Sequence, residues 1–200
     1  KLMPDDYATI LFSDIVGSSK IYSQQGNSRA EQLINDAVKE MSNTCIAHQG
    51  TVIKTIGDEV MCRFDEPDWA CDAAVEMNIR LKNMFNLQLR TGLCHGLVVS
   101  KEGDVYGDTV NNSAFLSKMA QARQILFDSN TYANLPTEKR TASELFDRVI
   151  LKGQQQASSV YRFLWEPSEE PDLDATMVVS KISTNDEAPS TELQIFFGDH

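Results

Sequence analysis

The spacing of apolar residues changes along the chain between an uninterrupted run, a helical repeat and short strand patterns. Tyr7–Ile15 is a run of apolar and β-forming residues, which predicts a buried strand. From Ser28 to Ala47 the apolar positions recur at helical spacing, which predicts an amphipathic helix. Two strand patterns follow, joined by Gly57-Asp58, a pair typical of a hairpin turn. These strands are predicted at Thr51–Ile56 and Glu59–Phe64.

The mixture of helices and strands continues beyond this hairpin. Pro67 opens a helix whose apolar residues share one face as far as Met84. Further helices are predicted from Val110 to about Ala120 and over Ser129–Leu135, and a first one can begin at the Gly17-Ser18-Ser19 break. Further strands are predicted at Leu87–Leu93, Gly96–Ser100, Gln124–Phe127, Phe146–Leu151 and Val160–Trp165. This order predicts an α+β fold with a ferredoxin-like split βαβ core (βααββαβ) and a C-terminal αβ extension.

Composition divides the chain into a domain and an acidic tail. The 200 residues, 42% of them apolar, suffice for one domain with a tail. From Glu166 onward nine acidic residues accompany a single basic one, so most of the net charge of −11 lies there. We therefore expect a domain at residues 1–165 and an acidic linker or tail at 166–200. Thr191–His200 resembles the first strand of a following domain, such as a forkhead-associated phosphothreonine reader, with a disordered end as the alternative.

The charge, the lengths of the apolar runs and the cysteines indicate in which cell compartment the protein is expected and which partners it is not expected to bind. An acidic chain is a poor general binder of nucleic acid, so no nucleic-acid partner is expected. No run of about 18 apolar residues is present, which predicts no membrane span. The four cysteines form no C-x-x-C pair and lie in apolar stretches typical of reduced core thiols. Without a visible signal peptide, these features indicate a cytoplasmic protein, of which this sequence is a piece.

Two acidic residues follow strand patterns and are candidates for metal binding. Asp14 ends the first strand and Asp58 lies at the tip of the hairpin, so both can meet at one edge of the sheet. Mg²⁺ typically takes one or two carboxylates together with substrate phosphates. The loop with Gly17 and Ser18 offers backbone N–H groups at a helix start, where phosphate binds readily. The alternative is structural: Asp14 caps a helix and Asp58 makes a turn.

Three segments around these residues carry a family resemblance. FSDIVGSS, IKTIGDEVM and GDVYGDTVNNSA stand in this order and begin at Phe12, Ile53 and Gly103. Together they resemble the catalytic domain of class III nucleotidyl cyclases, the family of adenylate and guanylate cyclases. The resemblance covers about residues 6–165, and it implies a class III cyclase-like fold. Three motifs in order are a stronger indication than any one of them alone.

The resemblance implies a role for each matching residue. Asp14, Asp58 and the backbone of Ile15 match the ligands of two Mg²⁺ or Mn²⁺ ions per site. The remaining matches concern the nucleotide. Lys54 and Asp104 match the pair that reads the purine, Asn111 the residue that orients the ribose, and Lys152 a lysine that contacts the terminal phosphates. A surface Lys54 and a turn Asp104 are the structural alternatives.

A lysine–aspartate pair is complementary to adenine. Adenine offers an acceptor at N1 and a donor at its amino group, whereas guanine reverses both and would leave buried polar groups unpaired. ATP is therefore the expected substrate. The resemblance further implies a homodimer with its active sites at the subunit interface, in which one chain supplies the metal ligands and its partner the groups that read base and ribose.

One position departs from the family pattern. The family usually carries an arginine four residues after the asparagine, and Phe115 stands there. Residues 111 and 115 share one helix face, so both are expected to face the cleft. Loss of a preorganised donor costs on the order of 10²–10³ in rate. Lys118, one turn further on, is a poor substitute for the missing guanidinium, and the alternative is that Phe115 packs in the core.

The function implied by the resemblance is that of an adenylate cyclase in intracellular signalling, which converts ATP to cyclic AMP and pyrophosphate. Because of Phe115, the alternative is a catalytically impaired domain that binds ATP or pairs with another cyclase domain. A third possibility is a different two-metal enzyme of similar topology, such as a diguanylate cyclase. The sequence contains no GGDEF-like run that would favour this last possibility.

Overall fold

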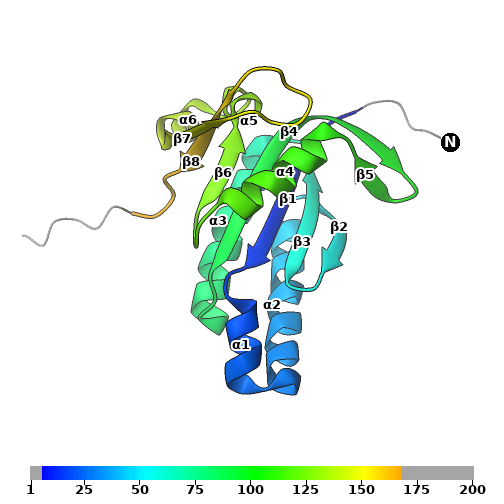
Figure 1. Cartoon of the computed structure of the whole chain (residues 1–200), viewed down its shortest axis with the longest axis vertical. Helices are drawn as coiled ribbons and strands as arrows, with labels where there is room; N and C mark the ends of the chain where they lie inside the picture. Colours follow the sequence, from blue (N-terminus) through cyan, green and yellow to red (C-terminus); the bar gives the residue numbers. More distant parts are fainter. Residues whose placement is uncertain (1–5, 168–200) are drawn as a thin grey trace, which may run out of the picture. The chain divides into compact units, whose positions relative to one another are not determined.

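A mixed sheet of eight strands organises residues 6–167, which are the residues that the computed structural model describes (Figure 1). Seven strands follow the order β2-β3-β1-β4-β6-β8-β7, and β5 pairs with β4 beside this path. The strands are β1 Asp6–Ile15, β2 Thr51–Ile56, β3 Glu59–Phe64, β4 Leu89–Lys101, β5 Asp104–Tyr106, β6 Ile125–Asp128, β7 Ser143–Val149 and β8 Ser158–Phe163. The helices are α1 Ser18–Gln25, α2 Asn27–Ala47, α3 Pro67–Phe85, α4 Asp108–Met119, α5 Ser129–Ala133 and α6 Thr137–Thr141.

Strand β1 is apolar along most of its length because both of its faces are covered. Leu11 and Ile15 point into the cluster formed with α2 and α3, whereas Ile10 and Phe12 point into a second cluster that includes α4 residues. Successive side chains of a strand alternate between faces, so a strand buried on both sides reads as a continuous apolar run. Figure 1 shows α4 crossing β1 and β4 on the face turned toward the viewer.

Helix α4 approaches the sheet closely at a glycine of β4. A Cβ at Gly92 would lie 2.4 Å from both the backbone oxygen of Ser113 and the backbone nitrogen of Ser117. The Ser113 hydroxyl donates to the backbone oxygens of Ile10 and Gly92, at 2.7 and 2.9 Å. This contact fixes the position of α4, which carries several of the predicted site residues.

The predicted fold class is confirmed, with corrections to individual elements. The observed order from β1 to β4 is that of the predicted βααββαβ core. The two strands predicted on either side of His95 are one, because Cys94 and His95 continue the antiparallel ladder with β1. Helix α4 begins at Asp108 rather than Val110, and the sequence pattern did not reveal β5 or α6.

The structure also bears on the predictions for the cysteines, the membrane span and the acidic tail. All four cysteines are buried and free, as predicted for core thiols. Within residues 6–167 no helix is both long and apolar enough to cross a membrane. The acidic segment and the strand predicted at Thr191–His200 lie outside the described residues, apart from residues 166 and 167. The domain boundary at 165 therefore stays a prediction.

Candidate active site

Asp14 lies at the end of β1 between two charged neighbours on the flanking strands. The antiparallel register places Glu59 of β3 opposite it on one side and Arg90 of β4 on the other. Its side chain is only 5% exposed. A carboxylate with so little access to water needs charged or hydrogen-bonding partners.

Two cations bind the carboxylate of Asp14. The Arg90 guanidinium donates through Nε to Oδ1 at 2.7 Å and through Nη2 to Oδ2 at 2.9 Å. The Lys118 ammonium donates to Oδ2 at 2.9 Å and to Glu59 Oε2 at 2.8 Å. The hydrogen bond with Asp14 raises the pKa of Arg90 above its usual value. Burial lowers the pKa of Lys118, but its bonds to Glu59 and Asp14 outweigh this and raise it overall.

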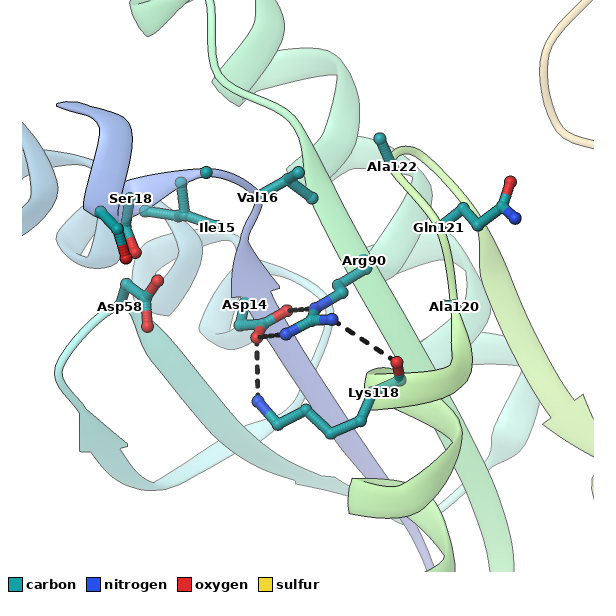
Figure 2. A pocket seen from close by; sticks show the side chains of 12 residues that line it. Asp14, Ile15, Val16, Ser18, Asp58, Arg90, Lys118, Ala120, Gln121 and Ala122 are labelled. Atoms are coloured by element: carbon teal, nitrogen blue, oxygen red, sulfur yellow. Dashed lines mark hydrogen bonds and ion pairs between the residues drawn. The ribbon is translucent and has the colours of Figure 1, made fainter.

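Asp58 lies in the turn between β2 and β3 and comes next to the end of β1. The backbone N–H of Ile15 donates to the backbone oxygen of Asp58 at 3.2 Å. Asp14 and Asp58 line the same cavity of about 490 Å³. Figure 2 shows Asp14 turned toward Arg90 and Lys118, while Asp58 lies next to Ser18. The cavity is lined by Asp14, Ile15, Val16, Gly17, Ser18, Ser19, Asp58, Arg90, Lys118, Ala120, Gln121 and Ala122.

The loop between β1 and α1 contributes the predicted phosphate-binding residues to this cavity. Gly17 has φ 75°, a left-handed conformation that glycine adopts without steric cost, and Ser18 is the first residue of α1. The turn exposes backbone N–H groups at the helix start, because the first N–H groups of a helix have no partner within it. The sequence prediction that Asp14, Asp58 and this loop converge therefore agrees with the geometry.

The donors in the cavity suit a hard divalent cation. They are all oxygens: the carboxylates of Asp14 and Asp58, with the backbone oxygen of Ile15 adjacent in the chain. Residues 6–167 contain no group of three or more His, Cys, Asp or Glu side chains placed to hold a metal. Within the described residues the cavity offers two carboxylates, so a cation bound there would complete its coordination with backbone oxygen, water or phosphate. This is the coordination typical of Mg²⁺ beside a phosphorylated substrate.

Lys54 and Asp104 form an ion pair away from this cavity. Lys54 Nζ donates to Asp104 Oδ2 at 2.8 Å, which joins β2 to β5. The hydrogen bond from Lys54 lowers the pKa of Asp104, with a smaller contribution from the backbone N–H of Val105. Both side chains remain partly exposed, at 41% and 28%. A group that binds between them meets one donor and one acceptor.

Asn111 and Lys152 also lie outside the cavity lining. Asn111 is exposed in the first turn of α4, where its side-chain amide donates to the backbone oxygen of Gly107 at 3.0 Å. Lys152 is held through its backbone: its N–H donates to Asn112 Oδ1 at 2.9 Å, and its oxygen accepts from Asn112 Nδ2 at 3.1 Å. Within one chain, therefore, some of the predicted site residues line the cavity and the others lie outside its lining.

Phe115 does not pack in the core. Its residue is 49% exposed on α4, so the core-packing alternative is wrong. Lys118 follows three residues later on the same helix face and donates hydrogen bonds to the carboxylates of Asp14 and Glu59. Phe115 has no polar group with which to make such bonds. The position at which the family usually places an arginine therefore presents an aromatic ring to its surroundings.

Arg90 and Glu59 are site residues that sequence reasoning missed. Glu59 stands in the motif that begins at Ile53, but that motif was interpreted only through Lys54 and Asp58, and Arg90 stands in a segment predicted only as a strand. The usable signal is the strand register, because Asp14 faces Glu59 and Arg90 once β1 is placed between β3 and β4. That pairing joins residues far apart in the chain, and periodicity along one strand does not specify it.

Comparison with known proteins decides the family. The model of the adenylate and guanylate cyclase catalytic domain matches residues 2–164. The chain belongs to this family. An adenylate cyclase of Streptomyces coelicolor is 26% identical to this cyclase domain over 170 residues, covering 82% of the chain and 45% of the relative. An adenylate cyclase of Glutamicibacter nicotianae is 28% identical over 138 residues, covering 67% of the chain and 34% of the relative.

A solved structure agrees with the fold. The adenylyl cyclase CyaB from P. aeruginosa superimposes with a TM-score of 0.72 at 20% identity, covering 86% of this chain and 100% of that one. The cyclase domain spans less than half the length of the curated relatives described above. The family includes adenylate and guanylate cyclases, so membership makes the chain a nucleotide cyclase domain. Membership does not distinguish adenine from guanine as the base of the substrate.

Proposed function

We propose that this cyclase domain converts ATP to cyclic AMP and pyrophosphate. The observation that carries the proposal is the convergence of Asp14, Asp58 and the loop at Gly17 and Ser18 on one cavity. Carboxylates and free backbone N–H groups side by side match a nucleoside triphosphate with its divalent cations. The Lys54–Asp104 pair supports adenine as the base.

The reaction is an in-line displacement at the α-phosphorus. The 3′-hydroxyl oxygen of ATP forms the new bond to phosphorus, the bond to the bridging oxygen breaks, and pyrophosphate leaves while the hydroxyl proton passes to solvent. Asp14, Asp58 and the Ile15 carbonyl would hold two Mg²⁺ or Mn²⁺ ions. Such ions make the attacking hydroxyl more acidic and neutralise the leaving phosphates. The backbone N–H groups at Gly17 and Ser18 hold the phosphates in line.

Base selection follows from the hydrogen-bonding groups of Lys54 and Asp104. The Lys54 ammonium donates to adenine N1, and the Asp104 carboxylate accepts from the adenine amino group. Guanine offers a donor and an acceptor in the opposite places, so it would leave both side chains unpaired. The low pKa of Asp104 keeps it an acceptor throughout the physiological range.

A complete site requires two copies of the chain. The metal-binding residues line the cavity, whereas Lys54, Asp104 and Asn111 are outside its lining and partly or fully exposed. A homodimer would assemble two equivalent sites if each chain placed its base- and ribose-binding residues next to the metal-binding cavity of its partner. Asn111 would orient the ribose and Lys152 would contact the terminal phosphates in this arrangement.

A catalytically impaired cyclase domain is the second candidate. The exposed Phe115 favours it, because a phenyl ring cannot donate hydrogen bonds to the charge that grows on the α-phosphate. Such a domain would bind ATP, or pair with another cyclase chain, with little or no turnover.

Incubation with ATP and Mn²⁺ tests the proposal through the formation of cyclic AMP. The parent chain is expected to form the product slowly, and Asp58→Asn, which removes one metal ligand while keeping the size of the side chain, is expected to form none. Asp36→Asn, an exposed position on α2, is the matched control and should behave like the parent. ATP binding without product in the parent would favour the impaired domain, and neither binding nor product would refute the proposed activity together with the ATP-binding form of the second candidate.

A further inference from the structure

The Lys118 ammonium occupies the position between the two acidic side chains next to the proposed metal site. It lies 2.9 Å from Asp14 Oδ2 and 2.8 Å from Glu59 Oε2. Both carboxylates are largely shielded from water, with side chains 5% and 15% exposed. Figure 2 shows the lysine reaching from the end of α4 to Asp14 Oδ2, the oxygen that also accepts from Arg90 Nη2.

The donors already bound to Asp14 limit what else it can bind. A carboxylate offers about four lone-pair positions. Arg90 uses one on each oxygen and Lys118 uses a further one on Oδ2. A divalent cation that approaches Asp14 therefore meets a carboxylate with little free acceptor capacity and two positive charges at hydrogen-bonding distance.

Lys118 is the partner that can leave. Arg90 holds Asp14 through two parallel bonds from a rigid guanidinium, an arrangement that is strong and geometrically fixed. Lys118 contributes a single bond to Asp14 from a flexible stem, and its side chain is 54% exposed. Its second bond, to Glu59, can persist when the first is broken.

We infer that Lys118 is a built-in counter-ion of Asp14, which a divalent cation has to displace before it can bind this carboxylate. The inference rests on the metal-binding role of Asp14 in the proposed function. The inference adds that Lys118 opposes metal binding at Asp14. Metal binding is therefore coupled to the release of Lys118 from Asp14. The site then binds metal more weakly than its carboxylates alone would allow.

Direct measurement of Mn²⁺ binding, by the loss of the free-ion electron paramagnetic resonance signal without nucleotide, tests the inference independently of turnover. Lys118→Gln and Lys118→Met should each bind Mn²⁺ about tenfold more tightly, because a unit charge in contact with the ligand is removed. Lys118→Arg keeps the charge and should stay within about threefold of the parent. Lys20→Gln removes an equal charge from exposed α1 and should change the affinity by less than about twofold.

The outcomes separate this inference from the proposed function. Equal Mn²⁺ affinity in the parent and in both neutral Lys118 variants would overturn the inference and leave the function standing. An equal gain in Lys20→Gln would also overturn it, because the effect would then be one of net charge. Absence of Mn²⁺ binding in every variant, each checked for native circular dichroism, would overturn the metal site itself and the inference with it.

Discussion

Arg90 lies directly opposite Asp14 in the antiparallel pairing of β1 with β4, and its guanidinium binds both oxygens of the carboxylate. The strand register thus fixes both the position and the orientation of the most buried acidic side chain in the candidate site. A bidentate pair of this kind holds a carboxylate in one plane. Asp14 is therefore preorganised by the sheet before any cation or nucleotide arrives.

The exposed Phe115 leads to a prediction about rate. Phe115→Arg restores a forked donor on the helix face that carries Asn111, and turnover of ATP is expected to rise by about 10²–10³. Phe115→Leu removes the ring without adding a donor and should give no such gain. Initial rates of cyclic AMP formation at saturating ATP and Mn²⁺ measure the effect. Equal rates in the parent and Phe115→Arg would show that the missing arginine does not limit this site.

The Lys54–Asp104 pair leads to a prediction about base choice. Lys54→Met keeps the length of the side chain but removes the donor to adenine N1, so the ratio of kcat/KM for ATP to that for GTP should fall about tenfold or more. Lys82→Met, at an exposed position of α3 where the lysine ammonium donates to Asn86 Oδ1 at 2.7 Å, is the control. Parallel assays with the two nucleotides give the ratio, and an unchanged ratio in Lys54→Met would contradict the role of this pair.

His95 leads to a prediction about stability and pH. Burial lowers the pKa of His95, whose Nδ1 lies 2.9 Å from the Thr9 hydroxyl. An unfolded histidine takes up its proton near pH 6.5, whereas the folded one does so only at lower pH. The unfolded state then binds more protons, so the contribution of His95 to stability is present above about pH 7 and is lost as the pH falls through the lowered pKa.

His95→Gln should remove that contribution. Thermal unfolding of the parent and the variant at pH 7.5, 6.5 and 5.5 compares the two, and the comparison cancels the other titrating groups. The Tm of the parent is expected to fall more steeply with decreasing pH than that of the variant. Parallel curves would mean that His95 titrates alike in the folded and unfolded states.

The residues of the site differ in how far the sequence could predict them. Asp58 directly follows Gly57 in a hairpin turn and Asp14 lies at a strand end shortly before Gly17, so their convergence follows from local pattern and a simple sheet. Arg90 and Glu59 become neighbours of Asp14 only through strand pairing between distant segments. Lys118 was identified as a cation near the site, but its two bonds depend on how closely α4 packs at Gly92, a tertiary contact.

The fold shows the same division between local and tertiary information. The hairpin of β2 and β3 has the predicted bounds, because its turn and its alternation are encoded locally. The long strand β4 was predicted as two, since His95 and Gly96 interrupt its apolar pattern. All of β1, from Asp6 to Ile15, pairs with β4. This pairing supplies the hydrogen bonds that keep β4 continuous.

The central claim is that two chains share each active site, and complementation between inactive variants tests it most directly. Asp58→Asn damages the metal-binding half of a site and Asn111→Ala the ribose-binding half. Each variant alone should form almost no cyclic AMP. Coexpressed in equal amounts, half of the dimers would be mixed and each would contain one intact site, so the account predicts about a quarter of the parental activity. Activity of the mixture no higher than that of either variant alone would contradict it.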